Sequence, residues 1–325
     1  MADSSSQETR QSGRLMDYLA ITRLDHSVKH VLIIPGLILA WELRGFRSET
    51  PFYSVFLGFC AAVAVASANY VINEWLDRAS DRFHPTKSAR SAVVRELRPS
   101  LVYLQWGVLL GIGFTCGWLA STTMLAVLVL LAVQGVVYNI RPLRTKDRAY
   151  LDVISESVNN PLRLMIGWAM VDPGTLPPSS IILSYWAGGA FLMAAKRLSE
   201  FVEIEQRHGR QTLELYRKSF AGYSNVSLTV SCLVYALLSS FFLAVFLLKY
   251  RIEYLLLAPC IIALFAWYMA MAMRPSSSAQ NPERLFKEYG LIALVVLLAA
   301  QFVVLSFVNI PILEELASQR YLSVR

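Results

Sequence analysis

The stretch that decides the fold is PFYSVFLGFCAAVAVASANYVINEWLDRASDRFHPTKSAR, residues 51–90. Its first part, Pro51–Asn73, is apolar and long enough to cross a hydrocarbon layer of about 30 Å as a helix. Its second part, Glu74–Arg90, is crowded with acidic and basic residues. Carboxylates at the edge of a membrane are costly, so this arrangement predicts a membrane helix whose charged end carries chemistry.

The rest of the chain continues this apolar pattern. It has 325 residues, of which 55% are hydrophobic and only 16% are charged, against roughly a quarter charged in an average soluble domain. An ordinary soluble protein is therefore excluded, and we expect an all-α, polytopic membrane protein with about nine transmembrane helices. The expected spans are Ser27–Leu43, Pro51–Asn73, Leu101–Ala120, Thr122–Ile140, Tyr150–Val171, Ser180–Ala195, Ser224–Leu248, Glu253–Met273 and Tyr289–Val308.

The basic residues indicate how these spans are oriented. One alternating set of loops holds 23 Lys and Arg residues, and the other set holds six. Because such an excess marks the cytoplasmic side, we expect a multi-pass protein of the cell inner (plasma) membrane with its N-terminus and active site in the cytoplasm. We expect residues 1–22 to form a disordered or peripheral tail, residues 23–310 the transmembrane catalytic domain, and residues 311–325 a short tail.

Three oxygen-bearing side chains recur at helical spacing in the charged motif. Asn73, Asp77 and Asp81 lie four residues apart, so a helix places them on one stripe. Such ligands suit Mg²⁺, which takes one or two carboxylates together with phosphate oxygens and water. Along a continuous helix Asn73 and Asp81 would be about 12 Å apart, so either two ions bridge a long phosphate group or the helix ends near Asp81.

The stretch NEWLDRASDRFHPTK, residues 73–87, resembles the first Asp-rich motif of the UbiA superfamily of intramembrane prenyltransferases. Glu74 stands where that motif usually has its first Asp. The continuation D-R-x-H-P-x-K is more similar to one branch, the decaprenyl-phosphate phosphoribosyltransferases (decaprenylphosphoryl-5-phosphoribose synthases). This resemblance implies a nine-helix bundle around a central cavity that opens to the cytoplasm. It also implies Mg²⁺-dependent transfer of 5-phosphoribosyl from phosphoribosyl pyrophosphate (PRPP) to a polyprenyl (decaprenyl) phosphate, for a lipid-linked arabinose donor.

The resemblance continues at the ends of other expected helices. RLDHSVKH, residues 23–30, is similar to the entry to the branch's first helix and keeps its Arg and Lys. Residues 138–163 resemble the family's second loop and fifth helix, which end in an intramembrane Arg. An Arg there is expensive, so Arg163 either pairs with Glu156 or Asp152 or faces the substrate cavity.

The sixth apolar segment separates the branches. Aromatic prenyltransferases of the superfamily carry a second Asp-x-x-x-Asp there, whereas this chain has Lys196-Arg-Leu-Ser-Glu200. A lysine can neutralise a phosphate directly, although a surface ion pair between Lys196 and Glu200 is the simpler alternative. We expect Asn73, Asp77 and Asp81 to be catalytic and metal-binding. The expected substrate-binding residues are Arg23, Lys29, Arg82, His84, Lys87, Arg90, Tyr138, Arg144, Lys146, Arg163, Lys196, Arg197 and Glu200.

Two other functions remain open from the sequence. An aromatic prenyltransferase would use the same first motif, but it would lack its usual second Asp pair. A membrane transporter would need intramembrane charges on several helices, whereas most charges here lie at helix ends. The expected partners are PRPP, a polyprenyl phosphate and membrane lipid, with no nucleic acid, and a homo-oligomer stays open.

Overall fold

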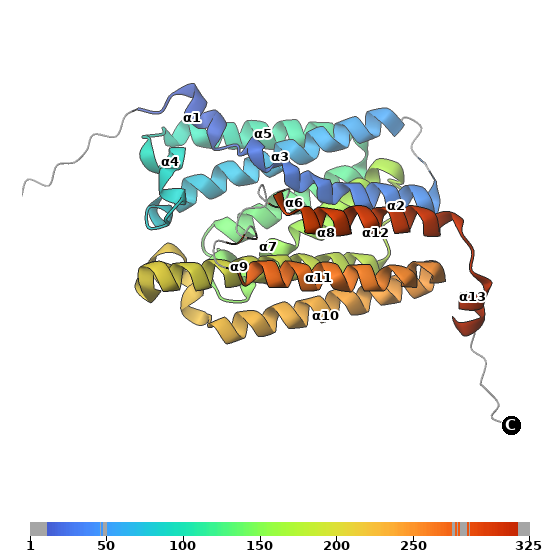
Figure 1. Cartoon of the computed structure of the whole chain (residues 1–325). Helices are drawn as coiled ribbons and strands as arrows, with labels where there is room; N and C mark the ends of the chain where they lie inside the picture. Colours follow the sequence, from blue (N-terminus) through green and yellow to red (C-terminus); the bar gives the residue numbers. More distant parts are fainter. Residues whose placement is uncertain are drawn as a thin grey trace, which may run out of the picture.

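The computed structural model describes residues 12–45, 47, 51–274, 277, 279, 285 and 287–317. Within these residues all regular elements are helices, and the β-type pairing is limited to an isolated bridge between Ser12 and Glu96. The long helices lie side by side in an elongated bundle (Figure 1). The expected all-α membrane fold is thus confirmed.

Six of the described helical segments are long and apolar enough to cross a membrane. Apolar side chains cover much of their outward surface, as expected for helices solvated by lipid. The elements involved are α3 (Pro51–Asp81), α5 (Pro99–Ala120), α6 (Thr122–Asn139), α10 (Asn225–Tyr250), η5 (Ile252–Leu257) continued by α11 (Ala258–Ala272), and α12 (Tyr289–Phe307).

The other three expected spans also correspond to helical elements. The first is η1 (Leu24–Ile33) followed by α2 (Ile34–Arg44), and the fifth is divided into α7 (Leu151–Ser157) and α8 (Asn159–Val171). The sixth belongs to α9 (Ser179–Tyr216), which continues far beyond the apolar segment and is interrupted at Gly209 (φ 80°). The number of nine spans stays a prediction.

Local sequence explains where several helices begin. Pro99 and Pro259 stand in the first turns of α5 and α11, where a missing N–H costs nothing. The side chain of Ser121 caps α6 by accepting a hydrogen bond from the N–H of Met124 at 3.0 Å. A capping box of Ser224 and Ser227 begins α10 in the same way.

Two glycines allow α2 and α8 to cross closely. A Cβ atom on Gly36 would lie 2.0 Å from the carbonyl oxygen of Leu164, and one on Gly167 would lie 2.1 Å from that of Ile33. Small residues at crossings of this kind let membrane helices approach backbone to backbone. This contact places α8, and with it α7, next to α3 and α6.

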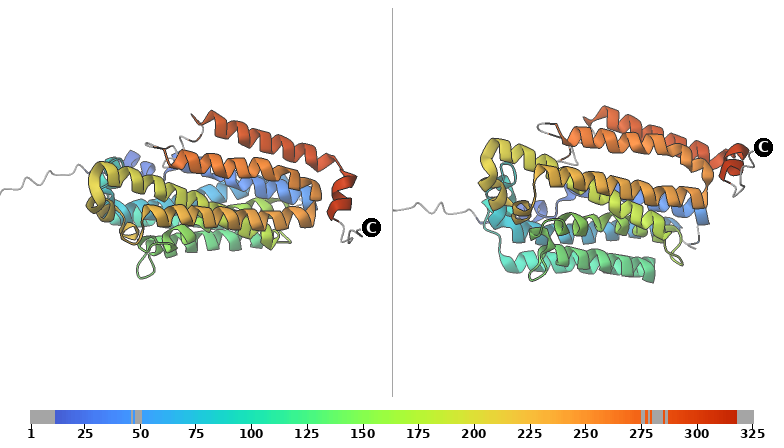
Figure 2. Two further views of the ribbon diagram at one scale, coloured as in Figure 1. Left: turned by 60° about the horizontal axis from the view of Figure 1, so that its bottom comes forward. Right: turned by 90° about the horizontal axis from the view of Figure 1, so that it is seen from below.

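Short elements gather at one end of the bundle, where α3 and α6 finish. They are α1 (Leu15–Ala20), η2 (Lys87–Ala89), α4 (Ser91–Val94), η3 (Thr145–Asp147) and η4 (Lys218–Gly222). The extension of α9 projects at the same end, whereas α13 (Pro311–Ala317) lies at the opposite one (Figures 1 and 2). We call the first of these the basic end, because the expected cytoplasmic loops are here.

The described part of the N-terminal segment packs against the basic end of the bundle. The N–H of Gly13 donates to the carbonyl oxygen of Glu96 at 2.9 Å, and Ile21 is fully buried. Residues 12–22 thus lie at the edge of the bundle, where Tyr18 and Ile21 make apolar contacts, and the expected division of the chain into tails and a catalytic domain stays a prediction. Residues 1–11 and 318–325 of the two expected tails lie outside the described residues.

Candidate active site

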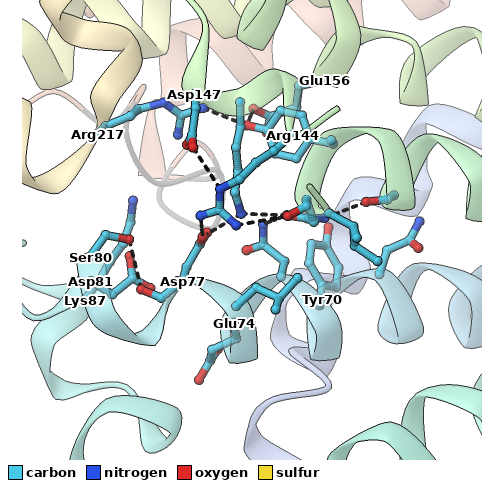
Figure 3. Close-up of a pocket in the computed structure, with 18 of the residues that line it drawn as sticks. Tyr70, Glu74, Asp77, Ser80, Asp81, Lys87, Arg144, Asp147, Glu156 and Arg217 are labelled. Carbon is cyan, nitrogen blue, oxygen red and sulfur yellow. Dashed lines mark hydrogen bonds and ion pairs between the residues drawn. The ribbon is translucent and has the colours of Figure 1, made fainter. Parts of the chain in front are cut away.

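A cavity of about 660 Å³ opens between α3, α6, α7 and α9 at the basic end. Figure 3 shows charged side chains that surround it, among them Asp77 on α3, Arg144 in the loop after α6 and Glu156 on α7. Its lining includes twelve of the sixteen residues expected from the sequence. They are Arg23, Lys29, Asn73, Asp77, Asp81, Lys87, Arg90, Tyr138, Arg144, Lys146, Lys196 and Arg197.

One part of the cavity lining carries the carboxylates of Asp77 and Asp81, and we call it the acidic side. The Oδ1 atom of Asp77 lies 2.5 Å from the ammonium nitrogen of Lys146 and 3.0 Å from Nη2 of Arg144 (Figure 3). Both cations come from the loop between α6 and α7. Burial lowers the pKa of Lys146 to about 8, and Asp77 opposes this shift. Asp77, Lys146 and Arg144 therefore form a group of one carboxylate and two cations. A bound diphosphate would need both a metal ion and positive charge at this place.

The side chain of Asn73 has a defined orientation. Lys146 donates to Oδ1 of Asn139 at 2.7 Å, and since an ammonium group cannot accept a hydrogen bond, this atom of Asn139 must be the oxygen. Nδ2 of Asn73 donates to the same oxygen at 2.6 Å. The carbonyl oxygen of Asn73 is thereby left available as a ligand.

Asp81 is separated from this group. Its Oδ2 atom pairs with Arg90 at 2.6 Å, and α3 continues without interruption to Asp81. A continuous helix keeps Asn73 and Asp81 about 12 Å apart along its axis, so one ion cannot contact both. Asn73 and Asp77 are one turn apart, about 6 Å along the axis.

Asn73, Asp77 and Asp81 fit a Mg²⁺ site in which phosphate oxygens of the substrate supply the remaining ligands. Among the described residues no group of three His, Cys, Asp or Glu side chains could hold a metal. An amide oxygen and one or two carboxylates at the mouth of an anion-binding cavity are nevertheless the usual protein contribution to a Mg²⁺–phosphate site. Asn73 and Asp77 would hold one ion, and Asp81, which that ion cannot contact together with Asn73, would serve a second ion or the outer side of the substrate phosphates.

Glu74 occupies a different position from its neighbours on α3. Its carboxyl group points away from Asp77 and Arg144 (Figure 3) and lies 3.8 Å from Arg23. The side chain is only 3% exposed. The carboxyl group of Glu74 therefore contacts Arg23 at the start of η1 and does not reach the group around Asp77.

A second part of the cavity lining, which we call the basic side, carries Lys196 and Lys29. Lys196 on α9 faces the cavity together with Lys29 from η1, and among the described residues no carboxylate lies within ion-pair distance of its ammonium group. Burial lowers the pKa of Lys196 to about 7; Glu200 opposes this, while Lys29 and Lys87 add to it. Such a group is poised to receive an anion.

The neighbouring Arg197 has a structural environment instead. It is 2% exposed and contacts Asp152, Glu156 and Glu200 at 3.3, 2.8 and 3.1 Å. Arg217 also reaches Asp152 at 3.3 Å and donates to the hydroxyl of Tyr138 at 2.7 Å. This network, which the sequence did not predict, attaches the extension of α9 to α6 and α7. It also means that Glu200 pairs with Arg197 and not with Lys196.

Four expected site residues lie outside the main cavity. His84 and Glu200 line a neighbouring cavity of about 620 Å³, which shares Lys87, Arg90 and Lys196 with the first. Nδ1 of His84 accepts hydrogen bonds from the backbone N–H groups of Thr86 and Lys87 at 3.1 and 3.2 Å. Burial lowers the pKa of His84 to about 3, so this imidazole is neutral.

Arg82 and Arg163 contact neither cavity. Arg82 is exposed in the turn that directly follows α3 and lines neither cavity. Arg163 is buried, and its Nη1 donates to the backbone oxygen of Asn159 at 3.4 Å. Within the described part of the chain Glu156 and Asp152 pair with Arg197, so neither alternative expected for Arg163 holds.

Several cavity residues were missed from the sequence. Asn139 was overlooked, although an amide at the end of an apolar span is itself a signal. Two residues that were expected, Arg23 and Arg144, line the cavity with positive φ, 52° and 27°. Non-glycine residues held in this region cost about 1–3 kcal/mol and gather at functional sites.

Comparisons with known proteins agree with this architecture. A profile described as the UbiA prenyltransferase family matches residues 32–295. A solved UbiA homolog from Archaeoglobus fulgidus bound to DMAPP and Mg²⁺ has a TM-score of 0.66 and 20% identity, covering 90% of this chain and 100% of that one. At this identity the likeness concerns the fold, and it confirms the UbiA-type bundle.

Curated relatives divide between activities. The chain is 29% identical over 168 residues to a decaprenyl-phosphate phosphoribosyltransferase of Mycolicibacterium smegmatis, covering 51% of this chain and 50% of that one. It is 24% identical over 192 residues to the nodulation protein NoeC of Azorhizobium caulinodans, 59% of each. A protoheme IX farnesyltransferase of Bacillus mycoides is also 24% identical, over 59% of this chain and 64% of that one. The chain thus spans half to about two thirds of these relatives' lengths.

Proposed function

The chain belongs to the UbiA prenyltransferase family, and we propose that it is a pentosyltransferase that moves 5-phosphoribosyl from PRPP to a polyprenyl (decaprenyl) phosphate with release of pyrophosphate. Family membership makes it a membrane transferase and argues against the transporter left open by the sequence. The relative from Mycolicibacterium smegmatis has the proposed activity in its name. The product would enter synthesis of a lipid-linked arabinose donor.

The observation that carries this proposal is the basic side of the cavity. Lys196 and Lys29 face a space that also contains Asp77, yet among the described residues Lys196 has no carboxylate partner. A prenyl diphosphate has one anionic end, which the acidic side can hold. PRPP has two anionic ends, and the second can neutralise cations that are uncompensated in the free protein.

The chemistry requires charge stabilisation more than proton transfer. When pyrophosphate leaves C1, positive charge develops on the ribose ring and negative charge on the leaving group, as in glycoside cleavage. Bound Mg²⁺ would supply positive charge to the leaving pyrophosphate. Arg144 and Lys146 stand beside Asp77, where their N–H groups can donate to the same phosphate oxygens.

The acceptor needs no general base. A phosphate monoester with a second pKa near 6 is largely dianionic at neutral pH. The neutral His84 and the structural Arg197 network are consistent with a site that holds charges in place and does not shuttle protons. The lipid acceptor would approach from the membrane, and PRPP would approach from the basic end, which we propose is cytoplasmic and at the inner membrane.

One assay tests the proposal. The purified protein should release pyrophosphate from PRPP only when both a polyprenyl phosphate and Mg²⁺ are present. The control reaction replaces PRPP with a prenyl diphosphate and offers an aromatic acid as acceptor. Release from PRPP without polyprenyl phosphate, or no release at all, contradicts the proposal.

A second candidate is transfer of a prenyl group to an aromatic or other small acceptor. It is favoured by the farnesyltransferase among the relatives and by the acidic side of the cavity, which would serve any diphosphate. Turnover of a prenyl diphosphate in the control reaction, with none of PRPP, would establish it. It leaves the basic pair of Lys196 and Lys29 without an explanation.

A further inference from the structure

The main cavity continues past Asn73 into the membrane-spanning part of the bundle, and amides line it there. Asn69 on α3, Gln134 on α6 and Asn159 at the start of α8 all face this inner part. Asn69 lies one helical turn, about 6 Å, farther from the basic end than Asn73. We call these three side chains the amide floor.

Each amide of the floor is held by one hydrogen bond to a backbone carbonyl. Asn69 donates to Leu131 at 2.9 Å, Asn159 donates to Glu156 at 2.9 Å, and Gln134 donates to Ser155. Within the described part of the chain these side chains make no other hydrogen bond. Because a carboxamide has two N–H donors and an oxygen acceptor, each one keeps a donor and an acceptor for a ligand.

Helix association does not explain the whole floor. The bonds of Asn69 and Gln134 join different helices, which is a common use of amides in membranes. The bond of Asn159 is local: it runs from the first residue of α8 to Glu156 in the preceding α7, three residues away, and joins no helices that are distant in sequence. Gly135 also leaves room for the floor, since a Cβ there would lie 2.1 Å from Oδ1 of Asn69.

The chemistry of the floor selects among ligands. A prenyl chain would bury these amides without giving them a hydrogen bond, which is costly in a membrane. A phosphate would use their donors but not their acceptors. Adjacent sugar hydroxyl groups both donate and accept, and they match the floor on both counts.

We propose that the amide floor binds the ribose hydroxyl groups of the donor and thereby makes the enzyme select a pentosyl over a prenyl group. This inference rests on the proposed function. The pyrophosphate lies toward Asp77, the 5-phosphate lies toward Lys196 and Lys29, and the ring between them faces Asn69, Gln134 and Asn159. The amide floor thus binds the ribose ring, which is the uncharged part of PRPP.

Binding measurements on floor variants test this assignment. Asn69→Leu, Gln134→Met and Asn159→Leu remove an amide at nearly constant size, and Asn159→Leu breaks only the local hydrogen bond between the consecutive helices α7 and α8. Gln301→Met, in α12 and outside the cavity, is the matched control for loss of an amide from a membrane helix. Calorimetry in detergent with Mg²⁺ gives dissociation constants for PRPP and, separately, for pyrophosphate, and thermal unfolding shows whether each variant is folded.

The two ligands separate the possible outcomes. Each floor variant should weaken PRPP binding about tenfold, in line with one lost hydrogen bond, and change pyrophosphate binding less than about twofold. The control should match the wild type for both ligands. Equal loss for PRPP and pyrophosphate, or no loss in any folded variant, overturns the assignment. If the wild type binds and turns over no PRPP, it is the proposed function that fails.

Discussion

The two sides of the cavity differ in whether their charged side chains have partners of opposite charge. On the acidic side, Asp77 is matched by Arg144 and Lys146, and Asp81 is matched by Arg90. On the basic side, Lys196 has further cations as neighbours and, among the described residues, no carboxylate at ion-pair distance. The carboxylates of the acidic side have cationic partners before a ligand binds. The cations of the basic side gain an anionic partner only when a ligand binds.

This difference teaches how the site can remain folded and still bind a highly charged substrate. A matched group costs little when the cavity is empty and keeps its geometry, because each partner stabilises the other's charge. An unmatched cation costs stability in the free protein but gains the most when an anion enters. The following changes alter one side or the other, in order of expected effect.

The acidic side is broken most severely by Asp77→Asn. The variant removes a candidate metal ligand and leaves Lys146 and Arg144 without their carboxylate. We expect pyrophosphate release from PRPP to fall by roughly 10³-fold or more, as when charge stabilisation of a transition state is lost. Pyrophosphate release by the purified variant, together with a thermal unfolding curve, measures this. Activity within tenfold of the wild type would show that Asp77 is not at the reacting end.

The basic side is broken by Lys196→Met, which keeps the length of the side chain and removes its charge. Loss of a hydrogen bond to a charged group should raise KM for PRPP by about 10- to 100-fold. The control is Lys249→Met, which changes an exposed lysine in the last turn of α10. If both variants have the KM of the wild type, the basic side does not bind the donor.

These two sides were not equally predictable from the sequence. Asn73, Asp77 and Asp81 share a stripe because the period of a helix fixes their spacing, and apolar runs marked most helices. The continuation of α9 to Tyr216 was missed, because residues 196–216 are polar and give no hydropathy signal. Sequence reports which charges exist and not where they point.

Particular side chains show this limit. Lys196 and Arg197 are adjacent and similar, yet one faces the cavity and the other is enclosed by carboxylates. An ion pair with Glu156 or Asp152 was one of two expectations for Arg163, but these two carboxylates contact Arg197. Directions such as these depend on how helices rotate against one another, which no local pattern determines.

The pH dependence of donor binding sharpens the comparison. The pKa of Lys196 is lowered to about 7 by burial, so the side chain is a cation below that pH and becomes neutral above it. Since PRPP is fully ionised above pH 7, we expect KM for PRPP to rise about tenfold or more between pH 7 and pH 8.5. Lys196→Arg stays charged throughout and should flatten this rise. A wild-type KM that is constant with pH, or an equal rise in the arginine variant, would contradict the role of Lys196.

Asn139 offers a milder change to the acidic side. It touches Asn73 and Lys146, and its oxygen fixes which atom of Asn73 is free. Asn139→Leu should weaken Mg²⁺ binding in the presence of pyrophosphate by about tenfold, as loss of a residue that orients a metal ligand commonly does. Calorimetric titration with Mg²⁺ measures this without catalysis. Asn225→Leu, exposed at the start of α10, should leave Mg²⁺ binding unchanged.

The smallest effect should come from Glu74→Gln, although Glu74 stands where the family's motif usually has an aspartate. Its carboxyl group points away from Asp77 and lies near Arg23, so its charge reaches the metal-binding group only indirectly. We expect kcat and Mg²⁺ affinity to change by less than about threefold, the scale of a weak ion pair. A loss comparable to that of Asp77→Asn would mean that Glu74 turns toward the metal when substrate binds. The acidic side would then be completed only by ligand, as the basic side is, and the contrast between a preformed side and a ligand-completed side would no longer hold.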